Sequence, residues 1–144
     1  KLRSDRKIIQ VLMDQTTPIG SGLGNYLAPE ALYRAKISPH KTIRDVYNDI
    51  TLSDALAEAI RYVTKLSFET ADIGYLGHLT DDMSSFVKQL RKQKDRYHSD
   101  TNIGNHKFKF NVYRQKVDPH GNKIKGEKDI IKGRTTYWSP TVQH

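Results

Sequence analysis

The 144-residue sequence contains no cysteine, which excludes disulfide bonds and thiolate metal sites. Apolar residues make up only 36% of the chain, a low share for a compact domain, so we expect long solvated segments. No apolar run approaches the roughly 20 residues that a membrane-spanning helix needs. These absences fit a reducing compartment and exclude a helical membrane protein of the usual kind.

The charge of the chain is unevenly distributed. The formal net charge is +8, and 14 of the 24 lysines and arginines lie between Phe86 and Arg134, against only 5 of the 16 acidic residues. Such asymmetry indicates a localised anionic partner, for which nucleic-acid phosphate is the natural choice. A solvated basic face is the alternative that charge alone leaves open.

A glycine-rich turn between two helical patterns is the most informative stretch. We expect one helix over residues 1–15 and another over about 26–36, with Pro29 and Glu30 in the first turn of the second. Glycines let the backbone approach a ligand closely, and the free N–H groups at a helix start can bind an anion. An ordinary turn is the plainer alternative. The candidate phosphate-binding residues are Gly22, Gly24 and Asn25, with Asn25 as the expected N-cap.

The middle of the chain predicts further helices. Residues 38–41 form a second turn, which Pro39 separates from the preceding helix. A third helix is expected to begin at Thr51, with Asp54 completing a capping box. Its apolar stripe would consist of Leu52, Leu56, Ala59, Ile60 and Val63. We expect a loop over residues 70–79, a fourth helix over about 80–96, and a linker over 98–106.

The spacing of apolar residues changes from helical to alternating towards the C-terminus. Alternating apolar residues predict a strand over residues 107–112, and residues 118–122 form a turn cluster. Residues 123–138 predict a β-hairpin with Arg134 near its tip. A lone hairpin is marginally stable, so it must pack on the helices. The predicted fold is therefore mainly α with a C-terminal β-hairpin, divided into a domain of about four helices over residues 1–97 and a linker and finger over residues 98–144.

The order of residues around the glycine-rich turn resembles a known motif. Leu12-Met13-Asp14-Gln15 is followed by Gly22-Leu23-Gly24-Asn25-Tyr26-Leu27 and then by Glu30, Leu32, Ala35, Ile37 and Pro39. This order resembles the helix–two-turns–helix motif of the formamidopyrimidine-DNA glycosylase / endonuclease VIII family of DNA-repair enzymes. The resemblance implies that Asn25 and the nearby backbone amides hold DNA phosphates beside the lesion.

The tail resembles the C-terminal finger of the same family, through Val112-Tyr113-Arg114 and residues 133–143. In that family two Cys-x-x-Cys pairs ordinarily bind zinc, and here the four ligand places fall on Val117, His120, Ser139 and Val142. Because valine donates no ligand and a structural zinc needs four donors, we expect no zinc cofactor. Such a zincless finger is similar to the endonuclease VIII-like 1 branch of vertebrates and some large viruses. Its packing would rest on Ile124, Tyr137, Trp138 and Val142.

Arg134 is the residue to which the resemblance gives most weight. In the family, the arginine after the hairpin's glycine grips a phosphate beside the flipped-out lesion and is assigned to the δ-elimination step. Independently of the resemblance, arginine offers a rigid, permanently charged fork that fits phosphate oxygens. A solvated turn arginine is the plainer alternative. Lys132 and Thr135 are further candidates for DNA contacts.

The resemblance implies a base-excision-repair DNA glycosylase and AP lyase that removes oxidised bases through an N-terminal proline amine and nicks the strand by β,δ-elimination. This sequence begins with Lys1 and its Pro29 is internal, so we expect it to be the C-terminal, DNA-binding half, without the N-terminal catalytic domain and unable to excise bases alone. The expected partners are damaged double-stranded DNA, including abasic sites, and that missing domain. We expect an intracellular monomer, in the nucleus or a compartment of a virus-infected cell, with no membrane partner.

Two other functions stay open at this point. One is a non-enzymatic helix–two-turns–helix module that binds RNA, of the kind found in a small-subunit ribosomal protein. The other is an interaction domain whose basic segment binds a protein. A hairpin at Gly133-Arg134-Thr135-Thr136 favours the repair family, because the ribosomal module has no such finger.

Overall fold

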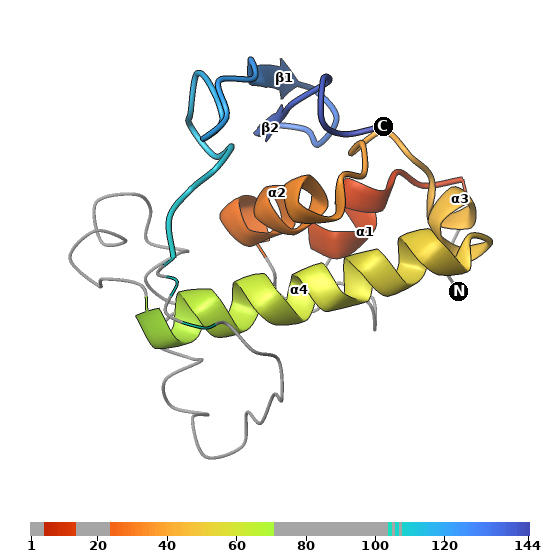
Figure 1. The fold of residues 1–144 in the computed structure, drawn as a ribbon. Coiled ribbons are helices and arrows are strands. Elements are labelled where there is room, and N and C mark those ends of the chain that lie inside the picture. The colour runs from red at the N-terminus through yellow and green to blue at the C-terminus, as the bar shows by residue number, and fades with distance from the viewer. Residues whose placement is uncertain (1–4, 14–23, 71–103, 105, 107) are drawn as a thin grey trace.

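A computed structural model describes residues 5–13, 24–70, 104, 106 and 108–144 (Figure 1). The predicted fold class is confirmed: the described residues contain four helices followed by a two-stranded antiparallel hairpin. The expected helix over 80–96 lies outside the described residues, as does most of the expected loop over 70–79. The elements are α1 (Ile8–Met13), α2 (Gly24–Ala35), α3 (Ile43–Tyr47), α4 (Ile50–Thr70), β1 (Lys125–Lys128) and β2 (Thr135–Trp138).

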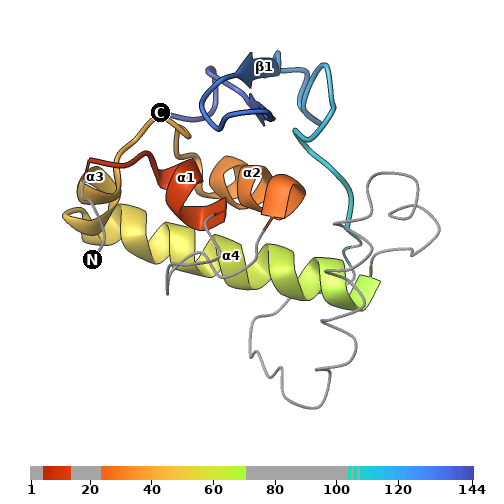
Figure 2. The ribbon, with the colours of Figure 1, turned by 180° about the vertical axis from the view of Figure 1, so that it is seen from behind.

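Helix α2 lies at the centre of the fold, between α4 on one side and the hairpin on the other (Figures 1 and 2). Its buried residues form one hydrophobic cluster with α1, α4 and the C-terminal segment. Because Phe110, Tyr113 and Ile130 belong to this cluster, the finger shares its core with the helices. The division at residues 97 and 98 stays a prediction. Among the described residues, no helix is long and apolar enough to cross a membrane.

Helix α1 is shorter than the sequence predicts. It begins at Ile8, and residues 5–7 are not helical, so the expected helix over 1–15 is wrong for these residues. The reason is a competing partner: Lys7 bridges to Thr42, and the Ile8 N–H donates to the Lys41 carbonyl at 2.6 Å. The Gln10 side chain accepts the Lys7 N–H at 3.1 Å and caps the start of the helix.

The start of α2 differs from the prediction, whereas the turn that follows its end agrees with it. The helix begins at Gly24, so Asn25 lies within its first turn and is not the N-cap that we expected. Pro29 and Glu30 are therefore one turn further into the helix than predicted. The helix ends in a Schellman motif, in which Lys36 has φ 61° and the Ile37 N–H donates to the Leu32 carbonyl at 2.9 Å. The predicted second turn follows at Pro39 and His40.

The capping box occurs one helix earlier than expected. Thr42 and Asp45 form it at the start of α3, with reciprocal bonds of 3.1 and 3.2 Å. At α4 the predicted pair Thr51 and Asp54 is wrong, because the helix begins at Ile50 and the Asp49 carboxylate caps it. The five residues of α3 were not predicted. The apolar stripe of α4 is confirmed, since Leu56, Ala59 and Val63 are buried.

The C-terminal hairpin is confirmed, but the strand predicted over 107–112 is wrong. Residues 108–112 are not in a strand, and the backbone N–H groups of Asn111 and Val112 donate to a side chain of α2 instead of a neighbouring strand. In the hairpin, Glu127 faces Thr136. Gly133, with φ 79°, adopts the left-handed conformation that turns the loop back into β2.

Candidate nucleic-acid interface

The loop between β1 and β2 presents Arg134 to solvent. Lys132, Gly133 and Arg134 are all exposed, whereas Thr135 is half-buried as the first residue of β2. The Arg134 N–H donates to the Ile131 carbonyl at 3.1 Å, which closes a tight turn. The backbone of Arg134 is thus fixed while its guanidinium group points outward. This is the placement that the sequence predicted.

The C-terminal segment that contains this loop carries many exposed basic side chains. Of the three acidic residues in this segment, Asp118 is buried and Glu127 contacts His40, Lys125 and Trp138, whereas Asp129 is exposed. A polyanion approaching the finger therefore meets mainly positive charge. The exposed basic residues between positions 114 and 134 are Arg114, Lys116, Lys123, Lys125, Lys128, Lys132 and Arg134.

The glycine-rich turn is described only at its last residues. Gly22 lies outside the described residues, and the backbone of Gly24 and Asn25 forms the first turn of α2. A helix of 12 residues such as α2 has unpaired N–H groups at its start, as phosphate binding requires. Whether Gly22, Gly24 and Asn25 hold phosphate stays a prediction.

A buried carboxylate joins α2 to the finger, a role that the sequence did not predict for Glu30. The Glu30 side chain accepts the backbone N–H groups of Asn111, Val112 and Tyr113 at 2.8, 3.0 and 3.0 Å. Burial raises the pKa of Glu30, and the three N–H groups act in the opposite direction. A glutamate between Leu27 and Ala31 on the apolar face of α2 was the available sequence signal.

A second carboxylate organises the turn at residues 118–122. Asp118 accepts the backbone N–H groups of His120 and Asn122, the Asn122 amide, and the Tyr33 hydroxyl at 2.8 Å. Burial raises the pKa of Asp118, but these hydrogen bonds outweigh it and lower the pKa to about 2. The turn was predicted, whereas its attachment to Tyr33 of α2 was not.

The Asp118 carboxylate should make the free energy of unfolding depend on pH. Its pKa is lower in the folded chain than the usual 3.8, so its contribution is complete above about pH 4 and is lost as the pH falls towards 2. We expect Asp118→Asn to remove part of the fall in unfolding free energy between pH 4 and pH 2. Urea unfolding across this range, with exposed Asp54→Asn as the control, measures the difference. Parallel pH profiles for wild type and Asp118→Asn would contradict it.

The four places that correspond to zinc ligands do not fit a metal. Val117 and Val142 carry no donor atom, and Val117 is 53% exposed. The Ser139 hydroxyl is buried without a hydrogen-bond partner, and His120 is exposed. Within the part of the chain that the structure describes, no three His, Asp or Glu side chains gather as a metal site. The donor set is therefore insufficient for the tetrahedral site that structural zinc requires.

Packing between finger and helices is incomplete near two of these places. His120 and Val142 line a cavity of about 400 Å³ together with residues of α2, α4 and the segment from Phe108. Ile124 is buried and Tyr137, Trp138 and Val142 are half-buried, as predicted for a finger held by packing. Polar contacts also join the finger to the helices.

One such contact lies at the end of the chain. Gln143 is only 2% exposed; its Oε1 accepts the Ser139 N–H at 2.8 Å, and its Nε2 donates to the Ile37 carbonyl at 2.9 Å. The His144 backbone adds a bond from its N–H to the Lys36 carbonyl at 3.1 Å. The last residues of the finger are therefore fastened to the C-terminal end of α2. The sequence reading did not predict this role.

The chain was compared with known protein families and relatives. Residues 99–144 match the family model described as the formamidopyrimidine-DNA glycosylase C-terminal domain. A formamidopyrimidine-DNA glycosylase of Prochlorococcus marinus (strain MIT 9312) is 34% identical over 148 residues, covering 99% of this chain and 42% of the relative. The endonuclease 8-like L720 of Acanthamoeba polyphaga mimivirus is 27% identical over 142 residues, covering 99% and 41%. The chain thus spans less than half the length of these relatives.

Solved structures give the same result for the fold. The crystal structure of a viral DNA glycosylase superposes with a TM-score of 0.55 at 25% identity, over 98% of this chain and 41% of that one. A complex of Lactococcus lactis Fpg with DNA containing an abasic site superposes with a TM-score of 0.61 at 23% identity, over 99% and 43%. The relatives are bacterial and viral, and assignment to the endonuclease VIII-like 1 branch stays a prediction.

Proposed function

Because this chain belongs to the formamidopyrimidine-DNA glycosylase and endonuclease 8-like family, we propose that it is the DNA-binding C-terminal half of a base-excision-repair enzyme. The whole enzyme would be a bifunctional DNA glycosylase and AP lyase that removes oxidised bases and nicks the strand by β,δ-elimination. Its partner would be damaged double-stranded DNA, including abasic sites. The L. lactis relative, which was crystallised with abasic-site DNA, supports this choice of partner.

The observation that carries the proposal is the exposed Arg134 on a cationic hairpin. A guanidinium group can bind two phosphate oxygens at once, and the fixed backbone of the turn leaves little to order on binding. Phosphate contacts of this kind position a duplex without reading its sequence. Base excision needs the damaged base outside the stack, and a grip on the flanking phosphate would hold the strand in that state. Lys132 and Thr135 would add contacts beside Arg134, and Gly22, Gly24 and Asn25 would hold a second phosphate.

We assign the excision chemistry to the N-terminal domain that the resemblance implies. Pro29 lies inside α2 and its nitrogen is an amide, so it cannot act as the amine nucleophile. This chain alone should bind DNA as a monomer without excising bases. Borohydride trapping on DNA with an oxidised base tests the assignment, because only the protein with an N-terminal proline amine should give a covalent complex. A trapped complex with this chain alone would contradict it.

Replacing Arg134 with alanine should weaken DNA binding about tenfold at moderate salt, because a charge-assisted phosphate contact is lost. The slope of log K against log salt should fall by about one unit. A fluorescence titration with a duplex carrying an abasic-site analogue, repeated across salt, measures both quantities. Arg61→Ala is the matched control, because Arg61 is exposed on α4, away from the hairpin. An unchanged slope for Arg134→Ala would contradict the phosphate grip.

We also propose that the finger works without zinc. The support is the donor set, in which Val117 and Val142 occupy two of the four ligand places. Elemental analysis of the purified chain should find no stoichiometric zinc, and a chelator should leave its unfolding midpoint unchanged. One zinc per chain would overturn this proposal.

The hairpin also bears on the RNA-binding alternative. That alternative describes a helix–two-turns–helix module without a finger, whereas β1 and β2 form a hairpin packed on α2. Comparison of duplex DNA carrying an abasic site with duplex RNA of the same length separates the two. Tighter binding to the RNA would favour the alternative.

A further inference from the structure

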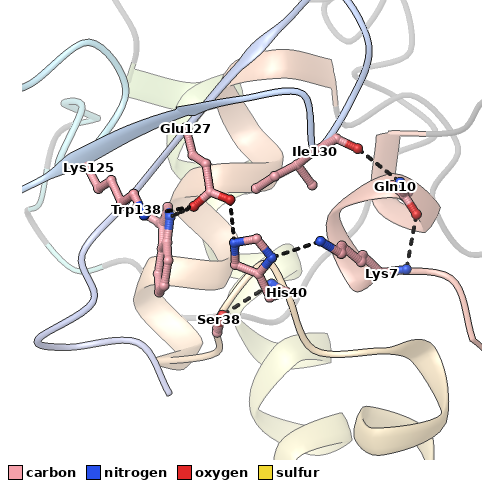
Figure 3. A network of polar contacts seen from close by, with 8 residues as sticks. All are labelled: Lys7, Gln10, Ser38, His40, Lys125, Glu127, Ile130 and Trp138. Atoms are coloured by element: carbon pink, nitrogen blue, oxygen red, sulfur yellow. Dashed lines mark hydrogen bonds and ion pairs between the residues drawn. The ribbon is translucent and has the colours of Figure 1, made fainter.

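A chain of polar contacts joins the second turn of the helical region to the hairpin (Figure 3). His40 lies at its centre: its Nδ1 is 2.9 Å from the Lys7 ammonium group, and its Nε2 is 2.7 Å from the Glu127 carboxylate of β1. The other Glu127 oxygen accepts the Trp138 indole N–H at 3.2 Å. With the ring proton on Nε2, His40 accepts from Lys7 and donates to Glu127, so both ring nitrogens are satisfied.

A second contact reaches the hairpin loop from α1. The Gln10 amide donates to the Ile130 carbonyl at 2.9 Å, and Figure 3 shows this bond beside the His40 contacts. Ile130 is 6% exposed and packs in the hydrophobic cluster, so the start of the loop is held by both its side chain and its carbonyl. The next residue, Ile131, accepts the Arg134 N–H. The position of Arg134 therefore follows from that of Ile130 through one short turn.

These contacts act on a different part of the finger from the other polar contacts. Glu30, Asp118 and Gln143 hold segments that flank the hairpin, whereas Gln10 and His40 reach the hairpin itself. Lys7 and Gln10 are three residues apart at the start of α1, so one helical turn supports both contacts.

We propose that Gln10 and His40 are positioning residues, which together hold the hairpin against α1 and the second turn and so fix where Arg134 lies for phosphate binding. This inference rests on the proposed function, because the placement of Arg134 matters only if Arg134 binds phosphate. Neither side chain needs to touch DNA. Their effect on binding should therefore disappear when Arg134 is absent.

A double-mutant cycle tests the inference in the full chain. Gln10→Met keeps the length of the side chain without adding a charge but removes the amide donor to Ile130. His40→Phe keeps a ring beside Trp138, with which His40 makes an edge contact at 5.4 Å, but removes both nitrogens. His40→Gln is the conservative variant, because its amide retains a donor and an acceptor. Each is combined with Arg134→Ala and titrated with duplex DNA carrying an abasic-site analogue.

Gln10→Met and His40→Phe should each weaken binding about three- to tenfold and lower the salt slope, whereas His40→Gln should recover most of the loss. In the Arg134→Ala background the same changes should have no further effect on binding. Losses that multiply in the double variants would overturn the inference while leaving the Arg134 grip intact. No loss for Arg134→Ala itself would overturn the proposed function and the inference with it. Circular dichroism verifies that each variant folds. If either the Gln10 variant or His40→Phe does not fold, the other variant is used for the test.

Discussion

Replacing Glu30 with alanine is expected to lower the free energy of unfolding by about 3–5 kcal/mol, a large share of the stability of a small domain. The substitution removes the acceptor of three backbone N–H groups at 2.8–3.0 Å. Those of Val112 and Tyr113 are buried, and each buried donor left without a partner costs about 1–3 kcal/mol. Urea unfolding at neutral pH, followed by far-ultraviolet circular dichroism, measures the change.

Glu30→Gln changes the hydrogen bonds while the size of the side chain stays nearly the same. One Glu30 oxygen serves Asn111 and the other serves Val112 and Tyr113, so an amide in either orientation faces at least one N–H with its NH2 group. The expected order of stability is wild type, then glutamine, then alanine. Glu58→Ala is the control, because Glu58 makes only an exposed ion pair with Arg34 worth about 0–1 kcal/mol. Equal stability of Glu30→Ala and Glu58→Ala would contradict the role of Glu30.

Gln143→Leu should lower the free energy of unfolding by about 2–3 kcal/mol, although leucine fills a similar volume. The substitution leaves the Ser139 N–H and the Ile37 carbonyl without partners in a site where Gln143 is 2% exposed. Because the finger has no complete set of metal ligands, we expect its C-terminal residues to loosen from α2. Thermal unfolding compares this variant with wild type.

Gln115→Leu is the matched control for that experiment. Gln115 is half-buried, and its amide donates only to the nearby Tyr113 carbonyl at 3.0 Å. Its loss should cost less than about 1 kcal/mol, because solvent can replace the single bond. If Gln143→Leu and Gln115→Leu unfold at the same temperature, the C-terminal contact does not hold the finger on α2.

Local patterns in the sequence were sufficient for the elements that local forces determine. Alternation in residues 123–138 and the glycine at 133 predicted the hairpin, because a positive φ at the turn is a property of one residue. The stripe from Leu56 to Val63 predicted α4. The exposure of Arg134 followed from its place at the hairpin tip.

The errors have a common physical cause, which is competition from distant partners. Residues 5–7 were predicted as helix but pair with the segment around Thr42. Residues 108–112 alternate like a strand, but the backbone N–H groups of Asn111 and Val112 donate to Glu30. Thr42 with Asp45 and Thr51 with Asp54 both have the spacing of a capping box. Spacing alone could not show that only the first pair forms one and that Asp49 caps α4. The roles of Glu30, Asp118 and Gln143 depend on contacts between segments far apart in the chain. No local pattern contains that information.

The placement of Trp138 gives the protein a built-in optical signal. It is the only tryptophan in the sequence, and its indole contacts Glu127 and His40 where the hairpin meets the second turn. Its emission should therefore shift to the red when the finger undocks, even if the helices remain folded. Comparison of this fluorescence with helical ellipticity in one titration would show whether finger and helices separate in two steps or in one.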